Sequence, residues 1–219
     1  MRTLVIASQK GGVGKTTLAG HLGVVAEQSG AGPVALIDCD PQGSLASWWN
    51  ERVAEAPLFA SVAIANLANH LQALERAGIK LAVIDTPPAV TNMISAVLQV
   101  ADLVLIPTRP SPHDLRAVGT TVDLVEAAGK KMIFVINGAA ARAKIAGEAA
   151  VALSQHGTVA PITLHQRTDF ASSMIDGRTV QEIDPKSRSA EEIVTLWKYV
   201  SAQLRRILYS AYVRISGDA

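Results

Sequence analysis

The stretch KGGVGKTT, residues 10–17, decides how this sequence folds. It follows an apolar run, TLVIAS at 3–8, and leads into a segment with the length and pattern of a helix at 15–28. Glycines between a strand and a helix let the backbone wrap closely around a phosphate, whose charge is attracted by the loop N–H groups and by the helix N-terminus. This context predicts a phosphate-binding loop. A glycine-rich turn with an ordinary lysine is the competing interpretation.

The end of the loop matches the general pattern G-x-x-x-x-G-K-[ST] at Gly14, Lys15 and Thr16. The first glycine of that pattern falls on Gln9, so the match is incomplete there. In a loop of this kind Lys15 contacts the β- and γ-phosphates and the Thr16 hydroxyl ligates Mg²⁺. Thr17 is placed to reach the α-phosphate.

Five short apolar runs alternate with longer helical patterns along the chain. The runs show no polar alternation, which is typical of strands covered on both faces of a parallel sheet. They lie at 3–8, 33–38, 80–85, 102–107 and 131–137, and the helical patterns lie at 15–28, 66–77, 91–100, 113–128, 142–156 and 189 to about 209. This alternation predicts an α/β fold, a doubly wound, mainly parallel sheet flanked by helices. The irregular stretch 176–188 is expected to be a surface loop.

Composition excludes several classes of protein. The 219 residues fit one domain, and 49% hydrophobic with only 18% charged residues argue against disorder. The net charge of +1 excludes a globally basic nucleic-acid binder, but not a local basic patch. The single cysteine fits a reducing compartment, no apolar run approaches the roughly 20 residues of a membrane span, and the strand-like start leaves no room for a signal peptide. We expect a cytoplasmic protein.

Two aspartates end predicted strands, Asp38 the second and Asp85 the third. Ligands of open α/β sheets bind at the carboxyl ends of the strands, so both carboxylates are expected to face the phosphate site. Carboxylate oxygens suit Mg²⁺, usually through its bound waters. Capping of a nearby helix is the alternative role for both aspartates.

Together these segments resemble the ParA/MinD superfamily of P-loop ATPases. KGGVGKTT is similar to its deviant Walker A motif, and DCDPQGS at 38–44 and VIDTPP at 83–88 match the next two motifs in order. The match continues through PTRPSPHDL at 107–115 and returns more loosely at 167–187. With no DNA-binding domain before the first strand, the chain is most similar to the small, ParF-like partition ATPases.

The resemblance implies a P-loop ATPase domain at residues 1–206, with ATP and Mg²⁺ as cofactors, and a C-terminal tail of unknown role at 207–219. Lys10 matches the signature lysine, which reaches the nucleotide of the partner subunit and so implies an ATP-dependent homodimer. With Lys10 and Lys15, the third expected catalytic residue is Asp40, which would position the attacking water. Capping of a turn is the alternative for Asp40.

The resemblance also assigns the ligands of the nucleotide and the metal. The expected nucleotide-binding residues are Gly11, Gly12, Val13, Gly14, Lys15, Thr16, Thr17 and Asn137. The expected metal residues are Thr16, Asp38 and Asp85. The strand at 131–137 ends in Asn137-Gly-Ala-Ala and lacks the Asn-Lys-x-Asp guanine reader, which favours ATP. Contact with adenine is implied for Asn137, and turn capping is its rival role.

Two kinds of surface partner follow from the resemblance. ParA members bind nonspecific double-stranded DNA of the nucleoid, and a ParB-like or cargo-adaptor protein stimulates their hydrolysis, whereas MinD members bind membrane through a C-terminal amphipathic helix. Basic residues are frequent late in the chain: Arg142, Lys144, Arg167, Arg178, Lys186, Arg188, Lys198, Arg205 and Arg206. Such a patch suits binding to DNA phosphates.

The tail at 202–215 has apolar residues at helical spacing, Leu204, Ile207, Leu208 and Ala211. These positions continue the apolar stripe of the preceding helix, so packing on the sheet explains them without lipid. We therefore expect a nucleoid-associated Mg²⁺-ATPase in plasmid or chromosome partition or cargo positioning, and no membrane binding. A MinD-like membrane-associated positioning ATPase is the alternative.

Neighbouring tryptophans, Trp48 and Trp49, follow the 38–44 motif on a probable helix. Side chains of adjacent helical residues point in different directions, so both cannot face the same core. One of them at a dimer or partner interface and partial burial of both under a neighbouring helix are the two interpretations.

Overall fold

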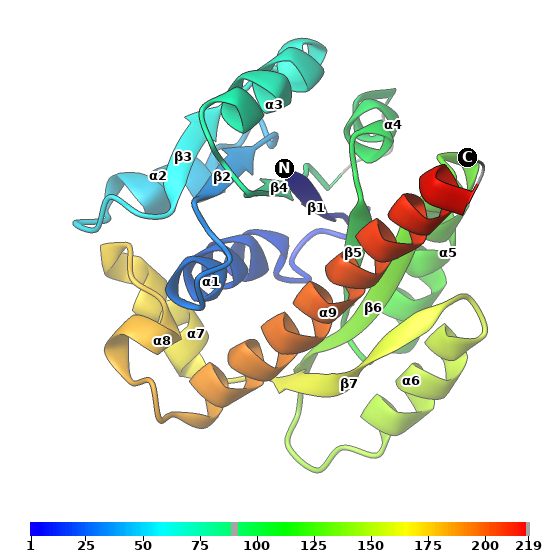
Figure 1. The fold of residues 1–219 in the computed structure, drawn as a ribbon. Helices are drawn as coiled ribbons and strands as arrows, with labels where there is room; N and C mark the ends of the chain where they lie inside the picture. The colour runs from blue at the N-terminus through cyan, green and yellow to red at the C-terminus, as the bar shows by residue number, and fades with distance from the viewer. Residues whose placement is uncertain (89–91, 218–219) are drawn as a thin grey trace.

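The structure is a computed structural model that describes residues 1–88 and 92–217, with side chains for 1–88, 94–207 and 209. Its centre is a seven-stranded sheet in the order β3-β2-β4-β1-β5-β6-β7, in which every described pair is parallel (Figure 1). The strands are β1 (Arg2–Ile6), β2 (Val34–Asp38), β3 (Leu58–Ser61), β4 (Leu81–Asp85), β5 (Leu103–Thr108), β6 (Lys131–Ala139) and β7 (Thr158–His165). A parallel sheet brings all carboxyl ends of the strands to one edge.

Helices cover both faces of the sheet. They are α1 (Lys15–Gln28), α2 (Ser44–Asn50), α3 (Leu67–Arg76), α4 (Asn92–Gln99), α5 (Pro112–Ala127), α6 (Ile145–Ser154), α7 (Thr168–Ser173), α8 (Val180–Ile183) and α9 (Arg188–Gly217), with 3₁₀ turns η1 (Ile64–Asn66) and η2 (Met174–Asp176). The doubly wound prediction is confirmed by the two hydrophobic clusters, one on each face.

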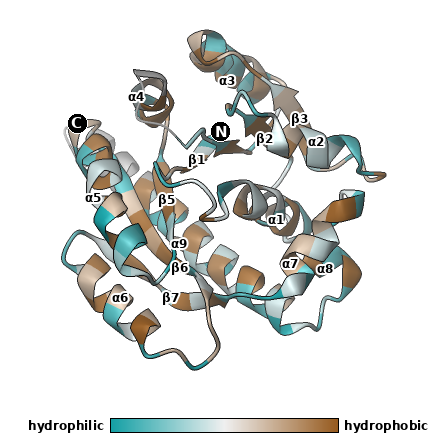
Figure 2. Ribbon diagram, turned by 180° about the vertical axis from the view of Figure 1, so that it is seen from behind, coloured by the Kyte–Doolittle hydropathy of each residue, from teal (hydrophilic) through white to brown (hydrophobic). Residues whose placement is uncertain are grey.

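Alternate side chains of each central strand enter different clusters. In β1, Leu4 and Ile6 pack with α1, α2 and α9, while Val5 packs with α3 to α6. Burial on both faces explains why these strands read as continuous apolar runs. In the hydropathy colouring of Figure 2, β2 and β3 are largely brown, whereas α5 and α6 carry both colours.

Both edge strands were missing from the sequence-based prediction. β3 is only 4 residues long and none of it is fully buried, so it is shorter than a central strand and is not covered on both faces. β7 contains Pro161, and its pairing with β6 shifts register between Phe134 and Ile136. Proline and a bulge are tolerated at a sheet edge, and they obscure the strand signal in the sequence.

The predicted surface loop at 176–188 is wrong in its central part. Residues 180–183 form α8, and Thr179, Val180 and Gln181 are at most 5% exposed. Thr179 and Glu182 form a capping box at the start of this helix, in which the Glu182 carboxylate accepts from the Thr179 N–H at 2.8 Å. The final helix also differs from the prediction, because α9 continues to Gly217 rather than to about 209.

Candidate nucleotide site

The loop between β1 and α1 has the backbone that a phosphate cradle requires. Gly12 and Gly14 have φ values of +74° and +89°, in the left-handed region that favours glycine. At Gly14 a Cβ atom would lie 2.5 Å from Nδ2 of Asn137, so glycine is also required sterically. The loop then opens α1 at Lys15, as predicted.

Lys15 is the buried cation of this loop, with 6% of the residue exposed. Its Nζ donates to the carbonyl oxygen of Lys10 at 3.4 Å. Burial lowers the pKa of Lys15, and the nearby carboxylates of Asp85 and Asp40 oppose that shift. A buried ammonium group beside exposed glycine N–H groups makes a compact anion site. Lys10 itself is exposed.

Asp85 and Thr16 meet beneath the loop. The Thr16 hydroxyl donates to Asp85 Oδ2 at 2.6 Å, while Asp85 Oδ1 is buried and has no partner among the described residues. Burial raises the pKa of Asp85 to about 7, the Thr16 bond opposes this, and the Asp38 carboxylate adds to it. A buried carboxylate oxygen without a donor fits a divalent cation, which would favour the ionised form. In the described chain, no group of three or more His, Cys, Asp or Glu side chains forms an all-protein metal cage.

Asp38 occupies the end of β2 as predicted, but both of its oxygens already accept backbone N–H groups. Oδ1 accepts from Asp40 at 2.9 Å, and Oδ2 accepts from Ala46 in α2 at 3.0 Å. Asp40 is half-buried, and its Oδ1 accepts from the N–H of Gln42 at 3.0 Å. The capping alternative therefore describes both aspartates in this state. Their carboxylates hold the loop 38–43 in shape.

Asn137 lies beside the phosphate loop at the end of β6. Its Nδ2 donates to the carbonyl of Val13 at 2.6 Å. A cavity of about 230 Å³ begins there; among its lining residues are Gly14, Thr17, Leu18, Asn137, Gln166 and Phe170. The position adjoins the loop where a nucleobase would follow its phosphates. The sequence pattern alone did not indicate the β7 side of this cavity, because β7 was not predicted.

Residues 4–180 match the family model described as the CobQ/CobB/MinD/ParA nucleotide binding domain. The chain belongs to this family. Its ParA and MinD members are P-loop ATPases, so the resemblance is confirmed and the chain is a P-loop ATPase with ATP and Mg²⁺ as cofactors.

Several ParA/MinD relatives carry functional names. Maintenance of carboxysome distribution protein A from Halothiobacillus neapolitanus is 30% identical over 201 residues, covering 87% of this chain and 91% of the relative. The protein of the same name from Gloeobacter kilaueensis is 43% identical over 123 residues, 55% of each chain.

Among solved structures, MinD from Aquifex aeolicus has a TM-score of 0.77 at 18% identity, covering 92% of this chain and 97% of its own. Apo McdA from Cyanothece has a TM-score of 0.73 at 21% identity, covering 91% and 98%. These two likenesses support the fold.

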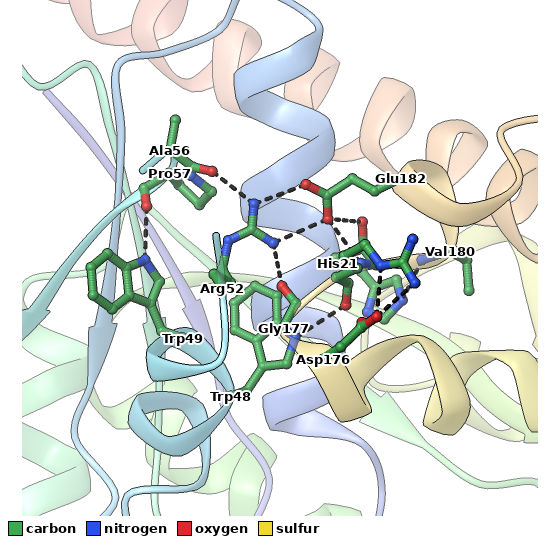
Figure 3. Close-up of polar contacts among 12 residues, drawn as sticks. His21, Trp48, Trp49, Arg52, Ala56, Pro57, Asp176, Gly177, Val180 and Glu182 are labelled. Atoms are coloured by element: carbon green, nitrogen blue, oxygen red, sulfur yellow. Dashed lines mark hydrogen bonds and ion pairs between the residues drawn. The ribbon is translucent and has the colours of Figure 1, made fainter. Parts of the chain in front are cut away.

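A polar cluster that sequence reasoning missed joins α1 and α2 to the segment 176–184 (Figure 3). Its central contact is an ion pair between Arg52 and Glu182, whose side chains are 2% and 18% exposed. His21 of α1 is fully buried and contacts Val180. A short sequence motif does not reveal these contacts, because Arg52 and Glu182, and His21 and Val180, lie about 130 positions or more apart in the chain.

The two tryptophans point to different surroundings, as predicted. Trp48 is 5% exposed and packs on Gly20 of α1, while Trp49 is half-buried and stacks on Phe59 with ring centroids 5.4 Å apart. Both indole N–H groups donate to backbone carbonyls, of Arg178 and Pro57 respectively. Partial burial thus accounts for their positions.

Two of the late basic residues form ion pairs with neighbouring carboxylates. Arg167 makes two bonds to Glu192 at 2.7 and 2.8 Å, and Arg178 pairs with Asp176 at 2.6 Å. The other basic residues of that set are exposed: Arg142, Lys144, Lys186, Arg188, Lys198, Arg205 and Arg206.

The predicted apolar stripe of the tail is only partly described. Leu204 is buried and Ile207 packs against the same cluster, whereas the side chains of Leu208 and Ala211 lie outside the described residues, as do residues 218–219. Packing therefore explains the two positions that are described. Within the described part of the chain, no helix combines the length and apolar character that crossing a membrane requires.

Proposed function

We propose that this ATPase hydrolyses ATP bound between two copies of the chain and that hydrolysis controls its reversible binding to DNA. The observation that carries the hydrolytic part is the pairing of Thr16 with Asp85, whose second oxygen is buried without a donor. These two residues would hold Mg²⁺, which neutralises charge on the β- and γ-phosphates when bound. Lys15 would add a second positive charge from inside the loop.

In this proposal Asp40 orients the water that attacks the γ-phosphate. Asp40 lies within the loop 38–43, whose shape Asp38 holds, so the position of the Asp40 carboxylate is defined before the nucleotide binds. Phosphoryl transfer depends on such positioning more than on covalent chemistry. Asp40→Ala should keep ATP binding and lose turnover, which would accumulate the ATP-bound dimer.

Asn137 would contribute to recognition of adenine. Its amide nitrogen is used by Val13, which leaves the amide oxygen as an acceptor for the adenine amino group. The neighbouring cavity supplies apolar walls from Leu18 and Phe170. Lys10, exposed at the rim of the loop, would reach the nucleotide of the second subunit.

The outward face of α9 is the surface that we propose for nonspecific DNA. Exposed residues follow each other along it at helical spacing: Arg188, Glu191, Thr195, Lys198, Arg205 and Tyr209. Three of these six are cations, and a dimer would double their number. Binding of this kind depends on phosphates and weakens with salt. Relatives named for carboxysome distribution and chromosome partitioning agree with a role in cargo positioning or partition, in which a ParB-like or adaptor protein would stimulate hydrolysis at the nucleoid.

The test is binding to a random DNA duplex without nucleotide, with ADP, and with ATP and Mg²⁺, each at two salt concentrations. We expect binding only with ATP and Mg²⁺, and weaker at the higher salt. Lys198→Glu with Arg205→Glu should reduce this affinity by at least about tenfold. The charge-matched control, Arg76→Glu with Lys130→Glu, reverses two cations outside the late basic set and should bind as the wild type does. An equal loss of DNA affinity in both double variants would contradict the assignment of DNA binding to α9.

A further inference from the structure

Arg52, two residues after the end of α2, is held by acceptors of the distant segment 176–184 and by the carbonyl of nearby Ala56. Its guanidinium donates to the carbonyls of Gly177 at 2.6 Å and Ala56 at 2.8 Å, and to the two oxygens of Glu182 at 2.9 and 3.0 Å (Figure 3). Only the planar, five-donor fork of arginine can satisfy several acceptors spread in this way. The side chain is 2% exposed, so these contacts are shielded from solvent.

The backbone around this contact is shaped to admit α2. Gly177 has a φ of +73°, and a Cβ atom there would lie 2.4 Å from the backbone nitrogen of Arg52. The Trp48 ring lies 5.0 Å from Arg52 Cζ, and its Nε1 donates to the carbonyl of Arg178 at 3.1 Å. Trp48 of α2 and Arg52, which lies two residues after the end of α2, are thus both fixed on the segment 176–184.

The other end of α2 carries the loop of the nucleotide site. Asp38 accepts from the N–H of Ala46 in the first turn and from the N–H of Asp40. α2 is only seven residues long, so a displacement at its C-terminal end is transmitted directly to the loop 38–43. Arg52 and Asp40 therefore lie on opposite sides of one short helix, each held by its own contacts.

We propose that Arg52 is a positioning residue for ATP hydrolysis. By fixing α2 to Glu182 and Gly177, it keeps Asp40 where that carboxylate orients the attacking water. The inference rests on the proposed role of Asp40. It adds that the segment 176–184, remote in sequence from both nucleotide motifs, sets the geometry of the hydrolytic step, where displacements of about 1 Å are costly.

The test compares Arg52→Lys and Glu182→Gln with Asp176→Asn. Lysine keeps the charge but cannot span the acceptors, and glutamine at position 182 still completes the capping box, so both variants should fold. Asp176→Asn is the matched control, because it removes a carboxylate of the same segment whose ion pair is exposed and local. Single-turnover hydrolysis and the Kd for ATP are measured for each.

We expect the hydrolysis rate constant of Arg52→Lys and Glu182→Gln to fall by about tenfold or more, with the Kd for ATP within about threefold of wild type. Hydrogen exchange should accelerate in residues 40–50 and remain unchanged in β1 and β4. The Asp176→Asn variant should match wild type in all three measurements. A parallel loss of ATP affinity with faster exchange in β1 and β4 would show a merely structural role and overturn the inference, as would a wild-type rate in Arg52→Lys.

Asp40→Ala, measured alongside, distinguishes failure of the proposed role of Asp40 from failure of the inference about Arg52. If Asp40→Ala hydrolyses ATP at the wild-type rate, the proposed role of Asp40 is wrong, and the positioning role of Arg52 fails with it. If Asp40→Ala is inactive but Arg52→Lys is not impaired, the proposed function stands and only the inference about Arg52 fails.

Discussion

At the scale of single residues, Asp85 shows how the fold prepares a metal position. The carboxylate is fully buried at the end of a central strand, where burial brings its pKa to about 7. Thr16 satisfies one oxygen and leaves the other without a donor. Burying the ionised carboxylate without a partner costs free energy, and a bound cation offsets that cost. The raised pKa of Asp85 therefore reflects a position that favours a cation.

His21 is a second buried titratable residue, and it serves structure rather than chemistry. Its Nδ1–H donates to the carbonyl of Thr17 at 2.8 Å, and its Nε2 accepts from the N–H of Val180 at 3.3 Å. Only the neutral ring can do both. Burial lowers the pKa of His21 to about 4, and the bond to Thr17 only partly opposes this. The contact between α1 and α8 is therefore stable at neutral pH.

The lowered pKa of His21 predicts how stability depends on pH. The unfolded ring binds a proton below about pH 6.5 and the folded ring only near pH 4, so stability present above pH 6.5 is lost as the pH falls towards 4. His21 alone should account for about 2.5 kcal/mol of the loss between pH 7 and pH 4.5. Urea unfolding of His21→Gln at the two pH values should show a correspondingly smaller loss than wild type.

His70 provides the matched control for that experiment. It also contacts the carbonyl four residues earlier, that of Asn66, but it is exposed on α3. His70→Gln should therefore keep the pH dependence of the wild type. An identical pH dependence in His21→Gln and wild type would contradict the assignment of a neutral, buried His21.

At the scale of elements, the phosphate loop and β6 interlock through Gly14 and Asn137. Gly14→Ala places a methyl group 2.5 Å from Asn137 Nδ2 and keeps a left-handed backbone. We expect the nucleotide-free protein to lose about 2–4 kcal/mol, from the strained φ and the broken bond to Val13. Gly129→Ala controls for the strain, because its φ is +66° with open space around it.

Urea unfolding of the two glycine variants measures the difference. Gly14→Ala should be less stable than Gly129→Ala by about 1–3 kcal/mol, and adding Asn137→Ala should recover part of that difference. If the two single variants lose equal stability, the steric contact between the loop and β6 is not the cause.

Elements differ in how far the sequence predicted them. α1 was predicted with its observed bounds, because a glycine loop marks its start and its apolar residues are buried along its length. Central strands such as β2 were predicted because both faces are covered. β3 and α8 are short, so their local patterns are too brief to distinguish from loop, and tertiary contacts decide their structure.

The candidate site divides in the same way. Thr16 and Asp85 were both predicted, with Asp38, to lie at the magnesium position, and the structure brings the Thr16 hydroxyl to 2.6 Å from Asp85. The contact of Arg52 with Glu182 spans 130 positions and has no motif. Such a pair is specified by three-dimensional packing alone, which a single sequence does not display.

At the scale of the whole molecule, the proposed dimer depends on Lys10. The side chain is exposed, and its backbone carbonyl rather than its ammonium group contacts Lys15. Lys10→Ala should therefore bind ATP as the wild type does, yet remain monomeric in sedimentation with ATP and Mg²⁺. Lys15→Ala should bind no nucleotide and also stay monomeric. A normal ATP-dependent dimer in Lys10→Ala would contradict the shared nucleotide arrangement.

The order of strands in the sheet also has a consequence during synthesis of the protein. β1 leaves the ribosome before both of its neighbours, β4 and β5, and Arg2 pairs with Leu81 about 80 residues later. At translation rates of about 5–20 residues per second, β1 waits roughly 4–16 s for its first partner. During that time Leu4, Val5 and Ile6, which the finished protein hides completely, are exposed on the nascent chain. A chaperone that covers apolar segments at the tunnel exit would therefore act on the segment that leads into the nucleotide loop.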